Sequence, residues 1–154
     1  FDQALSVLRQ GMDVAQSDSE KAQYWYLTGK AHVGKQDYSN AIDAFSNTLR
    51  VSSDPLLQEI ARYDRGTSYT RLEMYAEAVE DLKLLTASAN ERIRGAVQRM
   101  LGMAYLRLND QQEALRSYSE LAATSQNLSE RADYLILIVE LHQDVLLAIL
   151  IMFL

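Results

Sequence analysis

The chain contains no cysteine, one proline and six glycines among its 154 residues. The absence of cysteine excludes disulfides, thiolate metal sites and cysteine nucleophiles together. It leaves open the cytoplasm, which we favour, a periplasm and the periphery of a membrane. The scarcity of proline and glycine argues against a fold of short strands and turns. With 48% hydrophobic and 23% charged residues, the composition is typical of an ordered helical protein.

Basic residues are outnumbered, with 15 Lys and Arg against 21 Asp and Glu and a formal charge of −6. Phosphate backbones are bound mainly by clustered Lys and Arg, so this balance disfavours nucleic acid as a partner. The uninterrupted apolar run from Val145 to Leu154 is ten residues long, about half the length of a membrane-spanning helix. Residue 1 is Phe and no signal peptide is visible, so we expect the chain to begin inside a larger parent protein.

The sequence does contain a repeated pattern. Gly29, Gly66 and Gly102 lie 37 and 36 residues apart, and an alanine follows each of them after twelve residues. A period between about 20 and 50 residues is the mark of a repeat array. Within each period, apolar residues recur at intervals of three and four, which indicates α-helices. Each period therefore predicts a pair of helices.

Capping signals divide the chain into helices. Ser17 to Glu20 and Ser88 to Glu91 have the form of capping boxes, Asn127 to Glu130 offers a third, and Asp54-Pro55 is a helix start. In the last stretch, three residues are lost relative to the first copy, so either a turn is remodelled or one long helix runs through. By residue numbers, we expect helices at about 1–12, 20–34, 38–51, 55–72, 75–87, 91–108 and 111–124, and a helical stretch from 127.

These helix pairs, with glycine, alanine and aromatic residues at fixed offsets, resemble the tetratricopeptide repeat. The resemblance covers about residues 20–122 and is carried in the first copy by Trp25, Gly29, His32, Tyr38, Ala41 and Phe45. It implies an all-α solenoid in which antiparallel helix pairs stack into a right-handed superhelix. It also implies a protein-binding scaffold or adaptor. We divide the chain into one array: the second helix of a truncated repeat (1–16), repeats at 20–52, 55–87 and 88–124, and a degenerate or partial repeat at 127–154.

The small residues of the pattern have a steric explanation. Glycine and alanine are expected where the two helices of a pair cross, since a larger side chain would push them apart. Thr28 and Arg65 depart from the pattern, because each stands where leucine is usual beside the glycine. In the last copy, Val139 stands where the glycine is expected.

The sequence offers little for catalysis. Of the two histidines, His32 occupies an aromatic core position, where we expect packing and not ligation. His142, Glu140 and Asp144 are spaced by two residues and do not share one helix face. There is no glycine-rich phosphate loop, serine-hydrolase elbow or zinc-protease motif. We expect no metal and no cofactor, and we interpret the chain as not an enzyme.

Charge is unevenly distributed along the pattern. The first-helix segments 20–35, 59–72 and 91–108 hold ten basic and four acidic residues, a balance of +6, which leaves −12 for the rest of the chain. By the resemblance, first helices line a concave groove, so the groove is expected to be basic. Tyrosine and arginine suit an acidic, partly apolar peptide; the alternative is an ordinary solvated face. The residues expected to face the groove are Gln23, Tyr26, Lys30, Val33, Ile60, Tyr63, Thr67, Thr70, Arg71, Arg99, Met103, Leu106 and Arg107.

One function of the family is disfavoured. Its chaperone-binding members hold a terminal carboxylate with Lys, Asn, Asn, Lys and Arg at set groove positions. In this chain the equivalent residues are Tyr26, Lys30, Asp64, Ala96 and Met100. The carboxylate clamp is therefore absent, and Asp64 would repel a carboxylate.

The apolar C-terminal run allows three interpretations. The array continues in the parent protein and covers it, the run mediates self-association or docking on a partner, or it rests on a membrane without spanning it. An exposed run of this kind would drive aggregation. The alternative function is therefore a structural subunit of a permanent complex. The residues predicted for such docking or oligomerisation are Val145, Leu146, Leu147, Ile149, Leu150, Met152 and Phe153.

Overall fold

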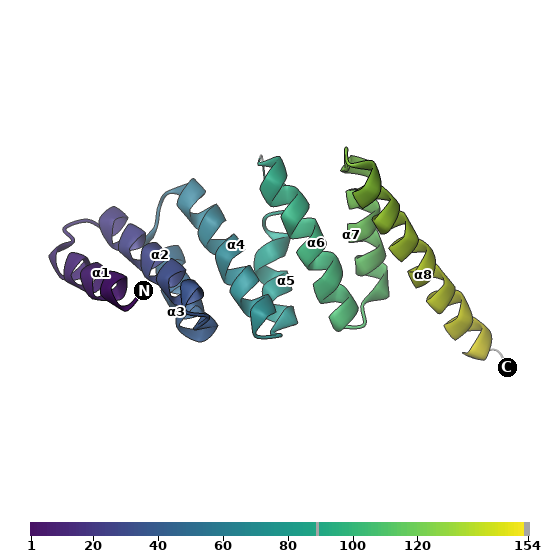
Figure 1. The fold of residues 1–154 in the computed structure, drawn as a ribbon, viewed down its shortest axis with the longest axis horizontal. Helices are drawn as coiled ribbons and strands as arrows, with labels where there is room; N and C mark the ends of the chain where they lie inside the picture. The colour runs from purple at the N-terminus through teal and green to yellow at the C-terminus, as the bar shows by residue number, and fades with distance from the viewer. Residues whose placement is uncertain (89, 153–154) are drawn as a thin grey trace. The chain divides into compact units, whose positions relative to one another are not determined.

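The computed structural model describes residues 1–88 and 90–152, and it describes their side chains except at Glu91 and at 144–152. All regular structure in these ranges is α-helical (Figure 1), which confirms the predicted all-α helical repeat. The helices are α1 (Asp2–Val14), α2 (Asp18–Gly34), α3 (Tyr38–Val51), α4 (Pro55–Arg71), α5 (Tyr75–Lys83), α6 (Glu91–Arg107), α7 (Gln111–Thr124) and α8 (Leu128–Met152).

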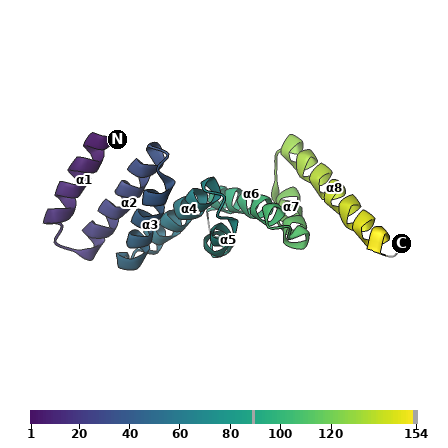
Figure 2. The same ribbon diagram turned by 90° about the horizontal axis from the view of Figure 1, so that it is seen from below.

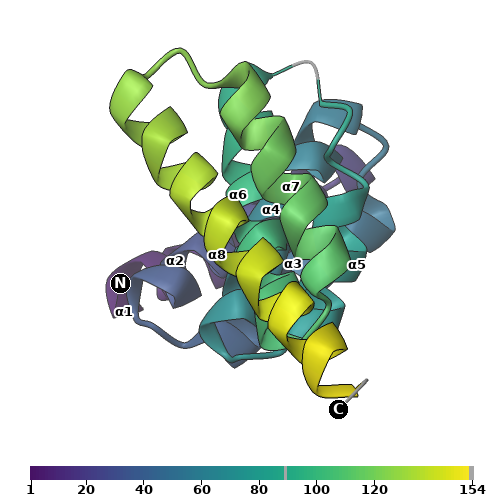
Figure 3. The ribbon, with the colours of Figure 1, turned by 90° about the vertical axis from the view of Figure 1, so that its right-hand side faces the viewer.

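The chain forms two compact units, residues 1–85 and residues 86 onward. In the first unit each helix packs on the next in sequence, from α1 to α5, and α2 also touches α4. In the second unit α6 packs on α7 and α7 on α8 (Figures 2 and 3). Packing mainly between helices that are consecutive or one apart in the sequence is the organisation of a repeat protein. The helix pairs predicted from the sequence correspond to α2–α3, α4–α5 and α6–α7. The division of residues 1–154 into one continuous array stays a prediction.

Most helix bounds agree with the sequence, and two features differ. The helices α3 and α7 have the bounds expected from capping and periodicity. In contrast, α5 ends at Lys83 and not near residue 87. For the last stretch, the alternative of one long helix is the correct one, since α8 runs without a break from Leu128 to Met152 (Figure 3).

The capping predictions were correct at α2 and at α4, where Asp54 is the N-cap and Pro55 the first residue, and wrong in detail at α6. Ser17 and Glu20 form the complete capping box of α2. At α6 the cap is Asn90 and not Ser88, because the Asn90 side chain accepts from the amides of Arg92 and Ile93. The Ser88 hydroxyl instead accepts from the Asn90 amide at 3.1 Å.

Asp54 and Asn127 repeat the arrangement seen at Asn90. A serine hydroxyl two residues earlier accepts from the amide of each, from Ser52 and from Ser125 respectively. At the starts of α4, α6 and α8, the sequence pattern is therefore Ser-x-Asx and not a capping box.

The glycines of the repeat lie where the helices of a pair cross. A Cβ atom built on Gly29 would lie 2.4 Å from the Phe45 ring, and one on Gly102 would lie 2.8 Å from the Tyr118 ring. At Gly66 the nearest atom, of Leu82, is 3.0 Å away. Real Cβ atoms essentially never approach within 3.0 Å, so the steric explanation is confirmed at Gly29 and Gly102, whereas the contact at Gly66 is tight but not excluded.

Candidate protein-binding surfaces

The face shared by α2 and α4 carries a hydrogen-bonded cluster of predicted groove residues. The Tyr26 hydroxyl donates to Asp64 Oδ2 over 2.9 Å, and Lys30 Nζ lies 3.1 Å from the same oxygen. Partial burial, and next the Asp64 carboxylate, raise the pKa of Tyr26 well above its usual range. The phenol therefore stays protonated and holds α2 to α4.

This cluster pairs one cation of the predicted basic groove. Lys30 was predicted to face the groove, and Asp64 forms an ion pair with it within the fold. Asp64 has 15% of its side chain exposed, so the ion pair lies partly out of water. An acidic ligand would have to compete with this carboxylate for Lys30.

Two further arginines of α4 point to α5. Arg65 makes two hydrogen bonds to Asp81, at 2.6 and 2.7 Å, and a third to the Ser46 hydroxyl of α3 at 2.8 Å. Arg62 Nη1 approaches the same carboxylate at 3.4 Å. Asp81, with 5% of its side chain exposed, raises the pKa of Arg65 through these hydrogen bonds. Both cations counted toward a basic groove are therefore structural.

The remaining predicted groove residues of the first unit differ in what they can offer. Thr67 and Thr70 donate their hydroxyls to backbone carbonyls of their own helix, at 2.8 and 2.9 Å. Arg71 is exposed and has no ion-pair partner among the described residues. The other members of the set are the exposed Gln23 and the half-buried Val33, Ile60 and Tyr63.

In the second unit, α6 carries the last four predicted groove residues. Arg99 and Arg107 are exposed, and no carboxylate among the described side chains pairs with either. Met103 is 48% exposed, and Leu106 is half-buried. This helix therefore offers cations next to apolar surface, and among the predicted groove residues of the first unit only Arg71 is comparable.

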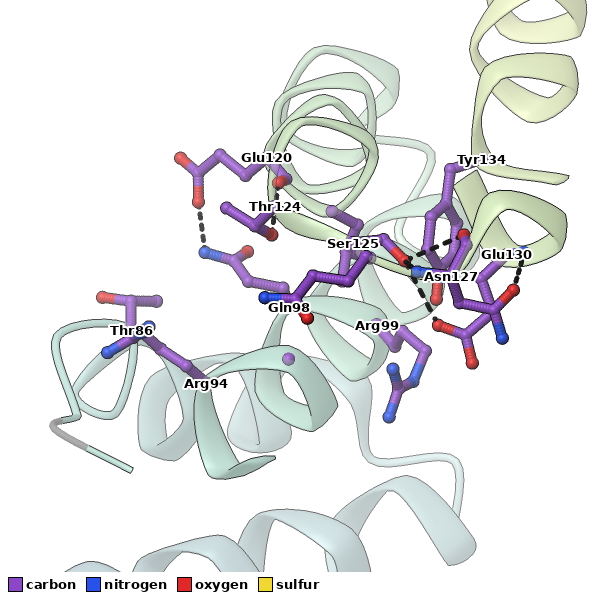
Figure 4. Close-up of a pocket in the computed structure, with 13 residues that line it drawn as sticks. Thr86, Arg94, Gln98, Arg99, Glu120, Thr124, Ser125, Asn127, Glu130 and Tyr134 are labelled. Carbon is purple, nitrogen blue, oxygen red and sulfur yellow. Dashed lines mark hydrogen bonds between the residues drawn. The ribbon is translucent and has the colours of Figure 1, made fainter. Parts of the chain in front are cut away.

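A pocket of about 550 Å³ opens in the second unit (Figure 4). It lies between the first turns of α6, the last turns of α7, the connection after α7 and the start of α8. Arg99 is the one predicted groove residue in its wall. The lining residues are Thr86, Arg94, Gly95, Gln98, Arg99, Glu120, Leu121, Thr124, Ser125, Gln126, Asn127, Glu130 and Tyr134.

This pocket was not predicted from the sequence, although the sequence contains a signal for it. Counted from the repeated glycines, Gln98 occupies the position of Trp25 in the first copy. A Cβ atom on Gly95, three residues earlier, would meet only the end of the Arg99 side chain, at 4.0 Å. Gln98 thus stands on the wall where the first copy has an aromatic side chain, and Gly95 beside it adds no side chain.

The histidines have structural contacts. His32 Nδ1 lies 3.0 Å from Asp37 Oδ2, and 19% of the His32 side chain is exposed. Hydrogen bonds from Asn40, and next from His32, lower the pKa of Asp37, which caps α3. His142 Nδ1 lies 2.8 Å from the Ile138 carbonyl, one turn earlier on α8. No group of three metal-ligating side chains occurs among the described residues.

The predicted docking residues 145–153 lie outside the described side chains. Earlier on α8, however, Leu135, Ile136 and Val139 are 48%, 56% and 56% exposed. Val139 stands at the position of the repeated glycine. In the other copies, the helix face around that glycine packs against the second helix of the pair. Among the described residues, no helix has the length and apolarity needed to cross a membrane.

The described geometry defines a class: a helical-repeat scaffold that presents the faces of its first helices. Residues 26–92 match the family model of the tetratricopeptide repeat, so this part of the chain is similar to tetratricopeptide repeats, and protein binding is the general role of such scaffolds. A solved structure described as "MamA RS-1 ArsTM double mutant" is similar, with a TM-score of 0.67 and 18% identity, covering 93% of this chain and 85% of that one. That likeness shows the fold. No curated protein matches the chain.

Proposed function

We propose that the chain is a non-enzymatic adaptor that binds an acidic, partly apolar segment of another protein on the faces of its first helices. The observation that carries this proposal is the contrast among the first-helix cations. Lys30, Arg62 and Arg65 face carboxylates of the fold. Arg71 and Arg107 are exposed without an ion-pair partner among the described residues, as is Arg99.

The neighbourhood of these arginines suits a segment with apolar anchors. Met103 lies one helical turn after Arg99 and one before Arg107, with about half of its side chain exposed. Guanidinium groups pair with carboxylates in two-point geometry, and methionine adapts to varied apolar side chains. A chaperone-type terminal carboxylate clamp is not proposed, because Asp64 occupies one of its positions and already holds Tyr26 and Lys30.

The test is selection of peptides from a displayed random library on the immobilised chain. We expect enrichment of peptides with Asp or Glu between apolar residues. The triple variant Arg71→Glu, Arg99→Glu and Arg107→Glu should lose these peptides. Arg9→Glu is the matched control, since Arg9 is an exposed arginine of α1, a helix that carries none of the predicted groove residues. Enrichment of basic peptides, or equal binding by the triple variant, would contradict the proposal.

A second candidate function is a structural subunit that docks, or associates with itself, through α8. The exposed Leu135, Ile136 and Val139 favour it. Size-exclusion chromatography with light scattering should then show a complex that Leu135→Glu with Val139→Glu converts to monomers. Leu56→Glu, at a leucine of α4 that is 64% exposed, is the control. A wild-type chain that stays monomeric would exclude self-association, and addition of lipid vesicles would test peripheral membrane contact.

A further inference from the structure

We propose that the pocket of the second unit binds a carboxylate of the partner segment, with Arg99 as the cation that holds it. This inference rests on the adaptor function proposed above and specifies where the acidic group is bound. The pocket volume of about 550 Å³ falls within the range of sites that enclose small ligands. It can therefore admit a whole side chain together with the main chain that carries it.

The pocket exists because of two substitutions in the repeat pattern. Gln98 replaces the aromatic residue that the first copy has at Trp25, and Gly95 leaves open space where other residues would place a side chain. The Gln98 amide does not fill this space, because it donates to Glu120 of α7. The cavity thus opens beside Gln98 and Gly95 of the third repeat, and we expect a large side chain at position 98 to fill it.

The charged side chains of the pocket wall differ in whether they have partners within the fold, and this difference indicates the charge of the occupant. Glu120 accepts from Gln98 and lies 3.6 Å from Arg116 Nε. Glu130 accepts from the Ser125 hydroxyl at 3.5 Å, and Arg94 donates to the Ser88 carbonyl at 2.7 Å. Both carboxylates of the wall therefore have donors within the fold.

Arg99 differs from the other charged residues of the wall. It is exposed, and none of the described side chains pairs with it (Figure 4). A guanidinium group offers five donors in a planar fork that matches a carboxylate. Arg99 therefore offers the pocket a cation without an ion-pair partner among the described side chains, which favours an anionic occupant. Glu130, in the first turn of α8, has the same charge as such an occupant and would lower its affinity.

The experiment is a titration of the isotope-labelled full chain, followed by amide chemical shifts, with three small probes. N-acetylglutamate N-methylamide carries a side-chain carboxylate, and N-acetylglutamine carries a terminal one. N-acetylglutamine N-methylamide is the neutral control. We expect at least one of the two carboxylate probes to shift the amide signals of the pocket residues. The neutral probe should bind at least about fivefold more weakly. The carboxylate that binds more tightly identifies its source in a partner.

Three variants test the roles of the wall residues. Arg99→Gln should weaken carboxylate binding at least about fivefold, and Glu130→Gln should strengthen it. Gln98→Trp should abolish it by restoring the residue of the first copy, with helical content and thermal midpoint kept. Equal affinity for the neutral probe, unchanged binding by Arg99→Gln, or weaker binding by Glu130→Gln would overturn the proposal.

The same variants separate this inference from the adaptor function. Gln98→Trp leaves Arg71 and Arg107 in place. If it keeps the selected peptides while the triple arginine variant loses them, the pocket is not the anion site but the adaptor function stands. If carboxylate probes bind the pocket although no acidic peptide is enriched, the adaptor function fails by itself.

Discussion

At the residue scale, the most informative departure from the repeat pattern is Arg65. It stands where leucine is usual, and the structure gives it three hydrogen bonds that join α3, α4 and α5. Its partner Asp81 is almost fully buried. Removing one member of a buried ion pair is costly because the other keeps its charge, whereas removing both can be nearly neutral.

We therefore expect Asp81→Leu to lower the free energy of unfolding by about 3 kcal/mol. The double variant Asp81→Leu with Arg65→Leu, which restores the usual leucine, should recover most of that loss. Urea unfolding followed by circular dichroism measures both. Additive losses in the double variant would show that the pair does not act as a unit.

The glycines give a second prediction at this scale, because identical substitutions should act in opposite directions. Gly29→Ala places a Cβ atom within 2.4 Å of the Phe45 ring, and overpacking of this kind costs about 1–3 kcal/mol. Gly95→Ala places one in open space, so the higher helix propensity of alanine should stabilise the chain by up to about 1 kcal/mol. Thermal unfolding of the two variants checks the signs. Destabilisation by Gly95→Ala would mean that its space is filled.

At the element scale, the starts of the second helices differ in one residue. Asp37 and Asp110 cap α3 and α7, accepting from amides three residues ahead at 3.4 and 3.2 Å. At the equivalent position before α5 stands Met74, which makes no cap hydrogen bond. Its backbone angles, φ −84° and ψ 68°, nevertheless match those of Asp37, φ −88° and ψ 70°. The backbone is thus already arranged for a cap that the side chain cannot provide.

Met74→Asp should consequently stabilise the chain by about 1 kcal/mol, the typical contribution of an N-cap. The reverse change, Asp110→Met, should destabilise α7 by a similar amount. Amide hydrogen exchange locates both effects, with slower exchange in the first turn of α5 and faster exchange in that of α7. An unchanged exchange rate in α5 would show that its start is fixed by other contacts.

Signals within a few residues of each helix end predicted the helices well. They did not predict features that depend on contacts between different helices. Capping residues and a 3.6-residue period fixed the bounds of α3 and α7, since both signals lie within a few residues of the helix ends. The expected basic groove was a count over segments, and it could not show that Asp64 and Asp81 neutralise Lys30 and Arg65 from other helices. The pocket was missed for the same reason, because its walls come from three helices.

At the scale of the whole molecule, the repeat period extends to the turns between paired helices. Gln36, Glu73 and Asn109 have φ of 60°, 59° and 59°, the left-handed region. In each turn, the amide of the following residue donates to the carbonyl five residues before it, at 2.8 to 3.0 Å. Left-handed geometry is unfavourable for residues other than glycine, and asparagine tolerates it best of the three. The chain therefore carries the same local strain at equivalent places of successive repeats.

Replacement of these residues by glycine tests whether the repeats contribute independently to stability. Gln36→Gly and Glu73→Gly should each stabilise by about 0.5–1 kcal/mol, after the entropy that glycine adds to the unfolded chain. Asn109→Gly should stabilise by less, and Gln36→Ala should not stabilise, which separates the backbone effect from loss of the side chain. The three turns share no hydrogen-bond partner among the described contacts, so the triple glycine variant should show the sum of the single effects. Calorimetric unfolding would reveal a smaller total if strain in one turn were relieved by adjustment of another.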